Sequence, residues 1–235
     1  MLFDPFYWFV IGIGLLLGLL ASARVKAATA HYSQIATRSG FTGAQVARAI
    51  LQANGIRDVQ VESVPGKLTD HYDPSSKTLR LSEIVYGERS ITAVGIAAHE
   101  VGHAIQHAQG YIPLRFRSAW VPVANIGTNI GIYVIMAAAF MGGVSGSPLM
   151  TWLGLGLFAT STLFTLVTLP VEFDASRRAM LTLEHSAVLT AEELPGARTV
   201  LNAAALTYVA GFISSLLVLL YWASRLGLFG RSNDE

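Results

Sequence analysis

Long uncharged runs alternate along this chain of 235 residues with segments that carry almost all of its charge. No Asp, Glu, Lys or Arg occurs in residues 5–23, 118–171 or 199–224. A helix that crosses the hydrocarbon core of a bilayer needs about 20 apolar residues and tolerates few ionised side chains. The middle run has room for two such helices. We therefore predict four transmembrane helices, at 5–23, 119–143, 149–169 and 204–224.

The first apolar run could also be read as a cleaved signal peptide, because A-S-A at 21–23 imitates a cleavage site. A signal peptide, however, carries its positive charge before the apolar run. Here Asp4 precedes the run, and Arg24 and Lys26 follow it. We therefore predict an uncleaved anchor whose N-terminus lies outside, because positive residues favour the cytoplasmic side.

The remaining charges agree with that orientation. Four spans with the N-terminus outside place residues 24–118 and 170–203 in the cytoplasm. These two segments contain 14 of the 16 Lys and Arg residues, and only Arg225 and Arg231 lie elsewhere. We predict a multi-pass protein of the cell membrane with a cytoplasmic domain at 24–118 and a cytoplasmic helical segment at 170–203.

A fifth apolar run, at 91–108, competes for a place in the membrane. It contains three histidines, a glutamate and a glutamine between positions 99 and 107. Burying that set in hydrocarbon would cost several kcal/mol. A span here would also place Arg115 and Arg117 on the side opposite to Arg24. The run is therefore predicted to be a helix, at about 90–108, that is buried in protein.

The rest of the cytoplasmic domain shows helical and then alternating patterns. Residues 28–38 and 43–53 are expected to form helices, the second capped by Thr42 and ended by Asn54-Gly55. Ser90 can cap the buried helix, and Gly110 with Pro113 can end it.

Strand patterns lie between these helices. V-Q-V-E-S-V at 59–64 alternates, and two short strands flank D-P-S-S at 73–76 as a hairpin with a four-residue turn. The fold class expected is a mainly α membrane protein with about four transmembrane helices and a small α+β cytoplasmic domain.

Composition narrows the function. The chain is 52% hydrophobic and 13% charged, which is typical of a membrane protein, so a lipid bilayer is an expected partner. A net charge of +1 argues against nucleic acid as a partner. Because there is no cysteine, any metal must be held by His, Asp, Glu or backbone groups.

The buried helix carries the sequence H-E-V-G-H at 99–103. Positions i and i+4 of a helix share a face, so His99 and His103 can present two imidazoles to one ion, with Glu100 about 100° round the helix. Zinc hydrolases use this arrangement, in which the glutamate takes a proton from the water. The alternative is a helix with histidines in its core. Two histidines and a glutamate at this spacing in a buried helix favour a metal site in a zincin-like domain. Gly102 offers a surface on which another element can pack closely.

A catalytic zinc site needs a third protein ligand. His107 stands about 6 Å further along the helix axis than His103, too far to reach the same ion. A motif in which a third histidine follows as H-x-x-G-x-x-H needs a glycine at 106 and a histidine at 109, but Gln106 and Gln109 occupy these positions. An acid from another element remains, and Glu172 and Asp174 stand out because they follow the third predicted span. The competing interpretation is charge compensation at the start of a new helix.

Three motifs together resemble a known family: H-E-V-G-H-A-I-Q-H, L-T-D-H-Y-D-P with T-L-R-L-S, and P-V-E-F-D-A-S. They are similar to those of the bacterial membrane-bound neutral zinc metallopeptidases, the YugP-like group. The resemblance covers most of the chain, from the first span to the start of the fourth. It extends more distantly to the HtpX-like membrane proteases, in which a Glu in E-x-x-A-D supplies the third ligand.

The resemblance implies a gluzincin-like site that holds one Zn²⁺ ion through His99, His103 and Glu172, with Asp174 as the alternative third ligand. It implies peptide hydrolysis in which Glu100 acts as the general base.

The resemblance also implies a close approach of two helices. Ala175 matches the small residue that lets the second helix lie near the H-E-V-G-H helix. Ser176 departs from the distant relatives, which have Asp there, so the partner of a ligating histidine is open, and Asp174 could fill that place.

Substrate binding is less well defined by the sequence. An extended polypeptide is expected to add as a strand along the hairpin edge near 77–82. Candidates for stabilising the oxyanion are His71, Tyr72, Arg177 and Arg178, which could equally be turn-flanking residues and topology-setting charges. Because Glu172 lies two residues past Pro170, at the end of the third span, membrane or membrane-adjacent proteins are the expected substrates.

Two other functions remain open from the sequence. One is an intramembrane zinc protease, whose H-E-x-x-H lies inside a span. The other is a zinc-binding membrane protein without hydrolysis, such as a sensor or carrier.

Overall fold

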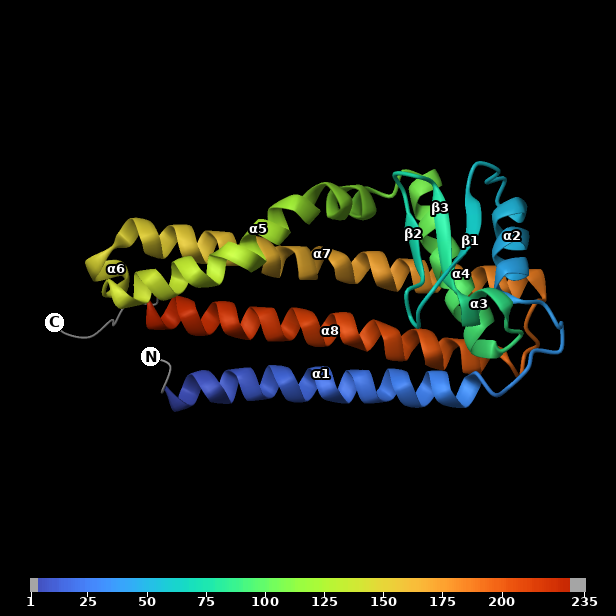
Figure 1. The fold of residues 1–235 in the computed structure, drawn as a ribbon, viewed down its shortest axis with the longest axis horizontal. Helices are drawn as coiled ribbons and strands as arrows, with labels where there is room; N and C mark the ends of the chain where they lie inside the picture. Colours follow the sequence, from blue (N-terminus) through green and yellow to red (C-terminus); the bar gives the residue numbers. More distant parts are fainter. Residues whose placement is uncertain (1–3, 229–235) are drawn as a thin grey trace. The chain divides into compact units, whose positions relative to one another are not determined.

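The structure is a computed structural model that describes residues 4–228 (Figure 1). Arg231, one of the two basic residues expected outside, lies beyond the described residues. The elements in chain order are α1 Pro5–Tyr32, α2 Gly43–Ala53, β1 Gln60–Val64, β2 His71–Asp73, β3 Thr78–Ser82, α3 Glu83–Gly87, α4 Ile91–Ala108, α5 Ile112–Phe140, α6 Gly143–Gly146, α7 Pro148–Ser186 and α8 Leu194–Arg225.

Four helices, α1, α5, α7 and α8, are long and apolar enough to cross a membrane. Within residues 4–228, α4 is not among them. The expectation of a mainly helical protein with four candidate membrane-spanning helices and a small sheet is therefore confirmed.

The chain divides into two compact units, and the first contains residues 4–20, Phe116–Leu169 and 208–228. Its core gathers around Ile135 and Trp222. Helices α5 and α7 approach closely there, because a Cβ at Gly127 would lie 2.2 Å from the carbonyl oxygen of Leu157. Small residues that permit such backbone contact are typical of helix pairs in membranes.

The second unit contains Ala21–Arg115 and Pro170–Thr207, and α4 runs through its core. Helix α2 and the sheet pack on α4, and Val94 and Val101 are fully buried there. Leu183 of α7 belongs to the same hydrophobic cluster. The apolar run at 91–108 is thus covered by protein, as expected.

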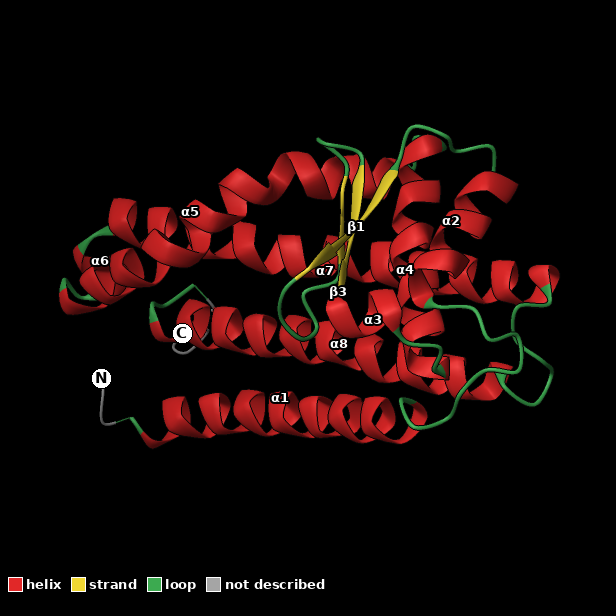
Figure 2. Cartoon of the chain, turned by 45° about the vertical axis from the view of Figure 1, so that its right-hand side comes forward, coloured by secondary structure: helices red, strands yellow, loops and turns green. Residues whose placement is uncertain are grey.

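The sheet has three strands in the order β1-β3-β2, labelled in Figure 1 and drawn in yellow in Figure 2. Strands β2 and β3 form the expected antiparallel hairpin, with Tyr72 opposite Leu79, while β1 pairs with β3 in parallel. The prediction that a substrate adds along 77–82 is wrong, because β3 has a strand on both sides. The outer edge of β2 is the free one on the hairpin.

Two of the expected helix caps are confirmed. Thr42 forms a capping box with Gln45 at the start of α2. Ser90 accepts a hydrogen bond from the backbone N–H of Ala93 at the start of α4. Gly110 follows α4 with a φ of +65°, the left-handed conformation that glycine adopts at no steric cost.

Two expectations about helices are wrong. No separate helix covers 28–38, because α1 continues unbroken from the apolar run to Tyr32. Nor does a new helix begin near Glu172, because α7 passes through Pro170 without ending. Proline disfavours a helix interior through the loss of one backbone bond, and helices in membrane proteins tolerate that loss.

Candidate metal centre

His99 and His103 of α4 face Glu172 of α7 in the second unit. The Nε2 atoms of His99 and His103 lie 3.3 and 3.5 Å from Oε2 of Glu172. One ligand atom from each of the three residues lies within 4.8 Å of the others, and no second such group occurs among residues 4–228. The two imidazoles and the carboxylate predicted from the sequence are therefore brought together.

These distances fit a zinc ion. Two donors that each lie about 2.1 Å from zinc at a tetrahedral angle are about 3.4 Å apart. The separations of 3.3 and 3.5 Å match that value and are long for hydrogen bonds. Two imidazoles and one carboxylate also make the donor set of a catalytic zinc site that keeps a fourth position open.

A buried glutamine fixes the protonation of His103. The amide nitrogen of Gln106 donates to the carbonyl oxygen of Val171 at 2.8 Å and to Oδ2 of Asp174 at 2.9 Å. Its amide oxygen therefore faces Nδ1 of His103, at 3.0 Å, and can only accept. Nδ1 must carry a proton, so the neutral imidazole presents the lone pair of Nε2 to Glu172. The Nε2 lone pair of His103 and the carboxylate of Glu172 are both electron-pair donors, and two such groups facing each other suit a cation.

His99 also has a polar partner on α7. Its Nδ1 atom lies 3.1 Å from the hydroxyl oxygen of Ser176. Ser176 thus stands beside one of the two histidines of the candidate metal site. Partners of this kind orient the imidazole and raise metal affinity.

Gly102 and Ala175 let α4 and α7 come close enough for the three ligands to meet. A Cβ at Gly102 would lie 2.5 Å from the carbonyl oxygen of Ala175, far inside an ordinary contact. Ala175 is itself fully buried. The close approach expected from these two small residues is confirmed.

Glu100 follows His99, one of the candidate ligands, and is buried, with 8% of its surface exposed. Among the described residues its carboxylate makes no hydrogen bond or ion pair. It lies close enough to His103 for its charge to help raise the pKa of that imidazole. A buried carboxylate without a structural partner, next to a metal centre, suits a group that exchanges protons with a substrate.

Several charges act on His103 at once. Burial lowers its pKa, but the nearby carboxylates of Glu172 and Glu100 outweigh burial and raise it above the ordinary value. In the metal-free protein this imidazole therefore binds a proton more strongly than a free histidine does.

Asp174 does not belong to the group of His99, His103 and Glu172, because it faces the glutamine and two arginines instead. Its carboxylate accepts hydrogen bonds from Gln106, Arg177 and Arg178. The alternative assignment of Asp174 as third ligand is not supported, whereas a supporting role is. Arg177 has an exposed side chain that pairs with Asp174 and does not contact the ligands.

His71 and Tyr72 lie on β2 and do not belong to the group of candidate ligands. His71 is exposed and donates from Nδ1 to the carbonyl oxygen of Thr69. The hydroxyl of Tyr72 bonds to Nδ1 of His107 at 2.8 Å. Burial and the nearby charges of Asp58 and Asp73 raise the pKa of Tyr72 to about 12. His107 thus contacts the sheet and does not belong to the group of candidate ligands.

The acids of L-T-D-H-Y-D-P build the hairpin. Asp70 accepts a hydrogen bond from the backbone N–H of Ser82 at 2.7 Å. Asp73 accepts from Ser75 and Ser76 in the turn and from Arg80 on β3. The hydrogen bonds from Ser75 and Ser76 hold the pKa of Asp73 below its ordinary value.

The sequence reasoning missed the role of Gln106, which was considered only as the residue that breaks a third-histidine motif. Its side chain is fully buried and joins α4 to α7 through two hydrogen bonds, to Val171 and Asp174. A third hydrogen bond links it to His103 on α4. A signal was present, because an amide three residues after a ligating histidine in a buried helix needs a polar partner.

Comparison with known proteins gives the same picture over almost the whole chain. A family model described as "Putative neutral zinc metallopeptidase" matches residues 7–227. The protein described as "Putative membrane protease YugP" from Bacillus subtilis (strain 168) is 42% identical over 219 residues, which cover 93% of this chain and 94% of that protein. No solved structure matches the chain.

Proposed function

Because the chain belongs to the neutral zinc metallopeptidase family, we propose that it is a membrane-bound endopeptidase that hydrolyses peptide bonds with one zinc ion. The observation that carries the proposal is the convergence of His99, His103 and Glu172 at the spacing of a tetrahedral zinc site. Each has a buried or partly buried environment, which protects the ligands from competition by water.

The residues around the site divide the work of hydrolysis. Zinc, when bound, polarises the scissile carbonyl and activates a water molecule for attack. Glu100 accepts the proton of the attacking water and delivers it to the leaving amine nitrogen. Gln106 and Ser176 keep the two imidazoles oriented, each through Nδ1.

Metal dependence tests the proposal. The purified full-length protein in detergent should contain one zinc per chain and cleave a casein-type substrate. A chelator should abolish cleavage, and added zinc should restore it. Cleavage that survives complete removal of the metal would refute the proposal. A chain that binds zinc in this site but cleaves nothing would favour the non-hydrolytic sensor or carrier.

The proposed orientation places the N-terminus outside and the metal centre in the cytoplasm. It rests on the distribution of Lys and Arg. The chain has no cysteine, so single-cysteine variants report their own side of the membrane. A membrane-impermeant maleimide should label Ser147→Cys in intact cells and label Arg57→Cys only after lysis. The reverse pattern would overturn the orientation.

The proposed substrates are membrane or membrane-adjacent polypeptides. Glu172 lies on the continuous helix α7, three residues past the end of the span expected at 149–169. A rise of about 1.5 Å per residue places the ligand within about 5 Å of that end along the helix axis. A substrate tethered to the membrane should be cut faster than its soluble version, and equal rates would contradict the proposal.

The outer edge of β2 is the proposed place where the substrate backbone binds. Edge strands offer unpaired N–H and C=O groups, and extended peptides pair with such edges. Strand β2 contacts α4, which carries the zinc ligands. N-methylation of the substrate amides that flank the scissile bond should therefore reduce kcat/KM, and an unchanged kcat/KM would exclude strand pairing.

The intramembrane alternative is less well supported. Helix α4 is packed among α2, the sheet and α7 and is not one of the candidate spans found in residues 4–228. An intramembrane protease would need this helix within the hydrocarbon.

A further inference from the structure

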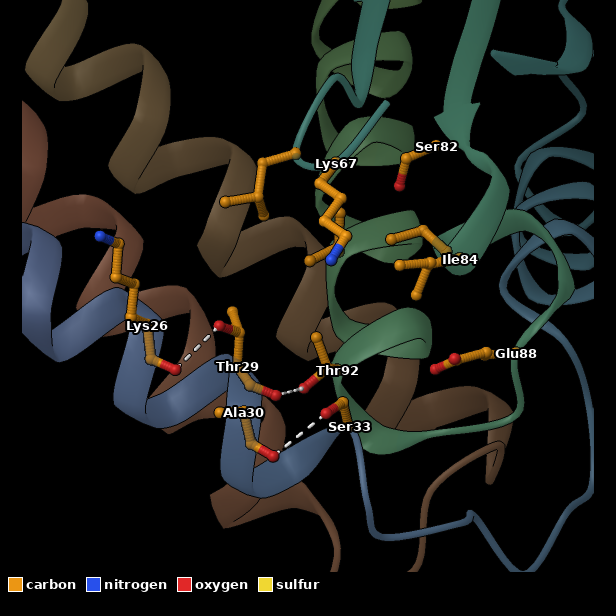
Figure 3. Close-up of a pocket in the computed structure, with 12 residues that line it drawn as sticks. Lys26, Thr29, Ala30, Ser33, Lys67, Ser82, Ile84, Glu88 and Thr92 are labelled. Atoms are coloured by element: carbon orange, nitrogen blue, oxygen red, sulfur yellow. Dashed lines mark hydrogen bonds between the residues drawn. The ribbon is translucent and has the colours of Figure 1, made fainter. Parts of the chain in front are cut away.

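A hollow of about 440 Å³ lies in the second unit beside α4 (Figure 3). It is bordered by the last part of α1, the loop before β2, the end of β3, and helices α3 and α4. Ile84, Val85 and Ile96 supply apolar walls. None of the three predicted zinc ligands lines it.

The hollow nevertheless continues the face of α4 that carries the ligands. Thr92 and Ile96 line it, and in a helix with 3.6 residues per turn they point within about 60° of His99 and His103. Ile96 precedes His99 by three residues and Thr92 by seven, which are axial distances of about 4.5 and 10.5 Å. An extended peptide advances about 3.3 Å per residue. A peptide cut at the metal centre could therefore place a side chain one to three residues from the scissile bond in this hollow.

The loop at the rim holds an apolar side chain in an uncommon backbone conformation. Leu68 has a φ of +56° and is 62% exposed. A leucine in the left-handed region is strained by roughly 1 kcal/mol, and such residues cluster at functional sites. Its neighbour in the loop, Gly66, has a φ of +109°, which suits glycine alone. The strain is explained if Leu68 adds apolar surface for a ligand.

The charges at the rim favour an anionic ligand group. Lys26 and Lys67 border the hollow, together with the single acid Glu88. In the part of the chain that the structure describes, neither lysine has an ion-pair partner. Two positive charges against one negative charge attract a carboxylate.

We propose that this hollow is a specificity subsite of the peptidase. It takes a bulky apolar side chain, such as Leu or Phe, one to three residues from the scissile bond, while the lysines bind an acidic residue next to it. The inference rests on the proposed peptidase function. The proposed occupant is a polypeptide, because the hollow continues along the face of α4 that carries His99 and His103.

A peptide series tests the apolar preference. The peptides are identical except that one residue near the cleaved bond is Ala, Leu or Phe. We expect kcat/KM for Leu or Phe to exceed that for Ala by about ten-fold or more, a typical discrimination for an apolar pocket. Ile84→Trp should remove most of that ratio by filling the hollow, and Ile112→Trp should not. Ile84 is 41% exposed and Ile112 is 77% exposed, so both positions tolerate a larger side chain.

The charge preference has its own variants. Lys67→Glu should reverse the preference for an acidic over a basic neighbour in the peptide, whereas Arg57→Glu, at an exposed position outside the hollow, should leave it unchanged. An Ala-to-Leu ratio that Ile84→Trp does not alter would overturn the proposal, as would a preference that Lys67→Glu leaves intact.

Binding separates this inference from the proposed function. The zinc-loaded Glu100→Gln protein and fluorescently labelled peptides give affinities by anisotropy without any cleavage. If the wild-type protein cuts nothing but the Leu peptide still binds more tightly than the Ala peptide through Ile84, the peptidase proposal fails and the subsite stands. Lipid binding is tested with anionic phospholipid vesicles. If Ile84→Trp weakens binding to these vesicles and the peptides show no side-chain preference, the hollow holds a lipid and the subsite proposal is wrong.

Discussion

Replacing Gly102 by alanine tests whether the approach of α4 to α7 sets the metal centre. The added Cβ would lie 2.5 Å from the carbonyl oxygen of Ala175 and 3.0 Å from its carbonyl carbon. An ordinary contact begins near 3.4 Å, so the backbone of α7 must move by about 0.9 Å. The atom in the way is backbone and cannot rotate aside.

That displacement is large for a zinc site. Glu172 lies three residues before Ala175 on the same helix, so its carboxylate moves with the backbone. Protein ligands hold zinc within about 0.2 Å of ideal distances. We expect Gly102→Ala to weaken zinc binding by about 10–100-fold, the range seen when partners of metal ligands are lost. Overpacking should also destabilise the fold by about 1–3 kcal/mol.

Gly95→Ala is the matched control on the same helix. A Cβ at Gly95 would lie 3.5 Å from the Cβ of Ala197, which is an ordinary contact. Alanine also favours a helix over glycine by about 1 kcal/mol. Competition with a chromophoric chelator gives zinc affinity, and thermal unfolding gives stability. Wild-type zinc affinity in Gly102→Ala would contradict the expectation. The metal centre would then form even when α4 and α7 lie further apart.

Four further outcomes follow from the same contacts. Gln106→Leu should weaken zinc binding by about 10–100-fold, whereas Gln109→Leu, in the next turn, should not, as chelator competition would show. Ser176→Ala should weaken zinc binding less than Gln106→Leu does in the same assay, because it removes a single hydrogen bond. Tyr72→Phe should leave zinc affinity unchanged, because its hydroxyl contacts His107 and not a ligand. In the metal-free protein, kept so by a chelator, protonation of His103 should stabilise the fold, because its pKa is higher in the folded state. This contribution to the free energy of unfolding should be present below the ordinary pKa of 6.5 and lost as pH rises through the raised value. Zinc binding needs the neutral imidazole, so the zinc-induced rise in Tm should grow over that same pH range.

The histidine pair and the spans could be predicted because they depend on local pattern. A spacing of four residues places His99 and His103 on one face of any helix. Charge-free runs locate membrane spans whatever the tertiary contacts, so four were found.

Elements that depend on distant contacts were predicted less well. The local sequence predicts the hairpin of β2 and β3, so β3 is expected to have a free outer edge. That edge is paired with β1, a parallel strand from an earlier part of the chain, and no local pattern predicts this pairing. The unbroken path of α7 through Pro170 was also missed, because proline usually ends a helix and the local sequence does not reveal the exception.

The surroundings of the ligands show the same limit. Glu172 was assigned through the family resemblance, since spacing along the chain cannot tell which acid meets α4. The role of Gln106 depends on Asp174 and on the carbonyl of Val171, which are 65 or more residues away in sequence. Only the three-dimensional structure shows that this amide fixes the tautomer of His103.

The zinc content and the peptidase activity of purified Glu100→Gln protein, measured together, test the central claim most directly. His99, His103 and Glu172 should hold zinc without help from Glu100, so the variant should keep one zinc per chain. It should lose casein hydrolysis, because the amide of glutamine cannot accept the proton of the attacking water. Hydrolysis at the wild-type rate, or loss of the zinc, would contradict the account.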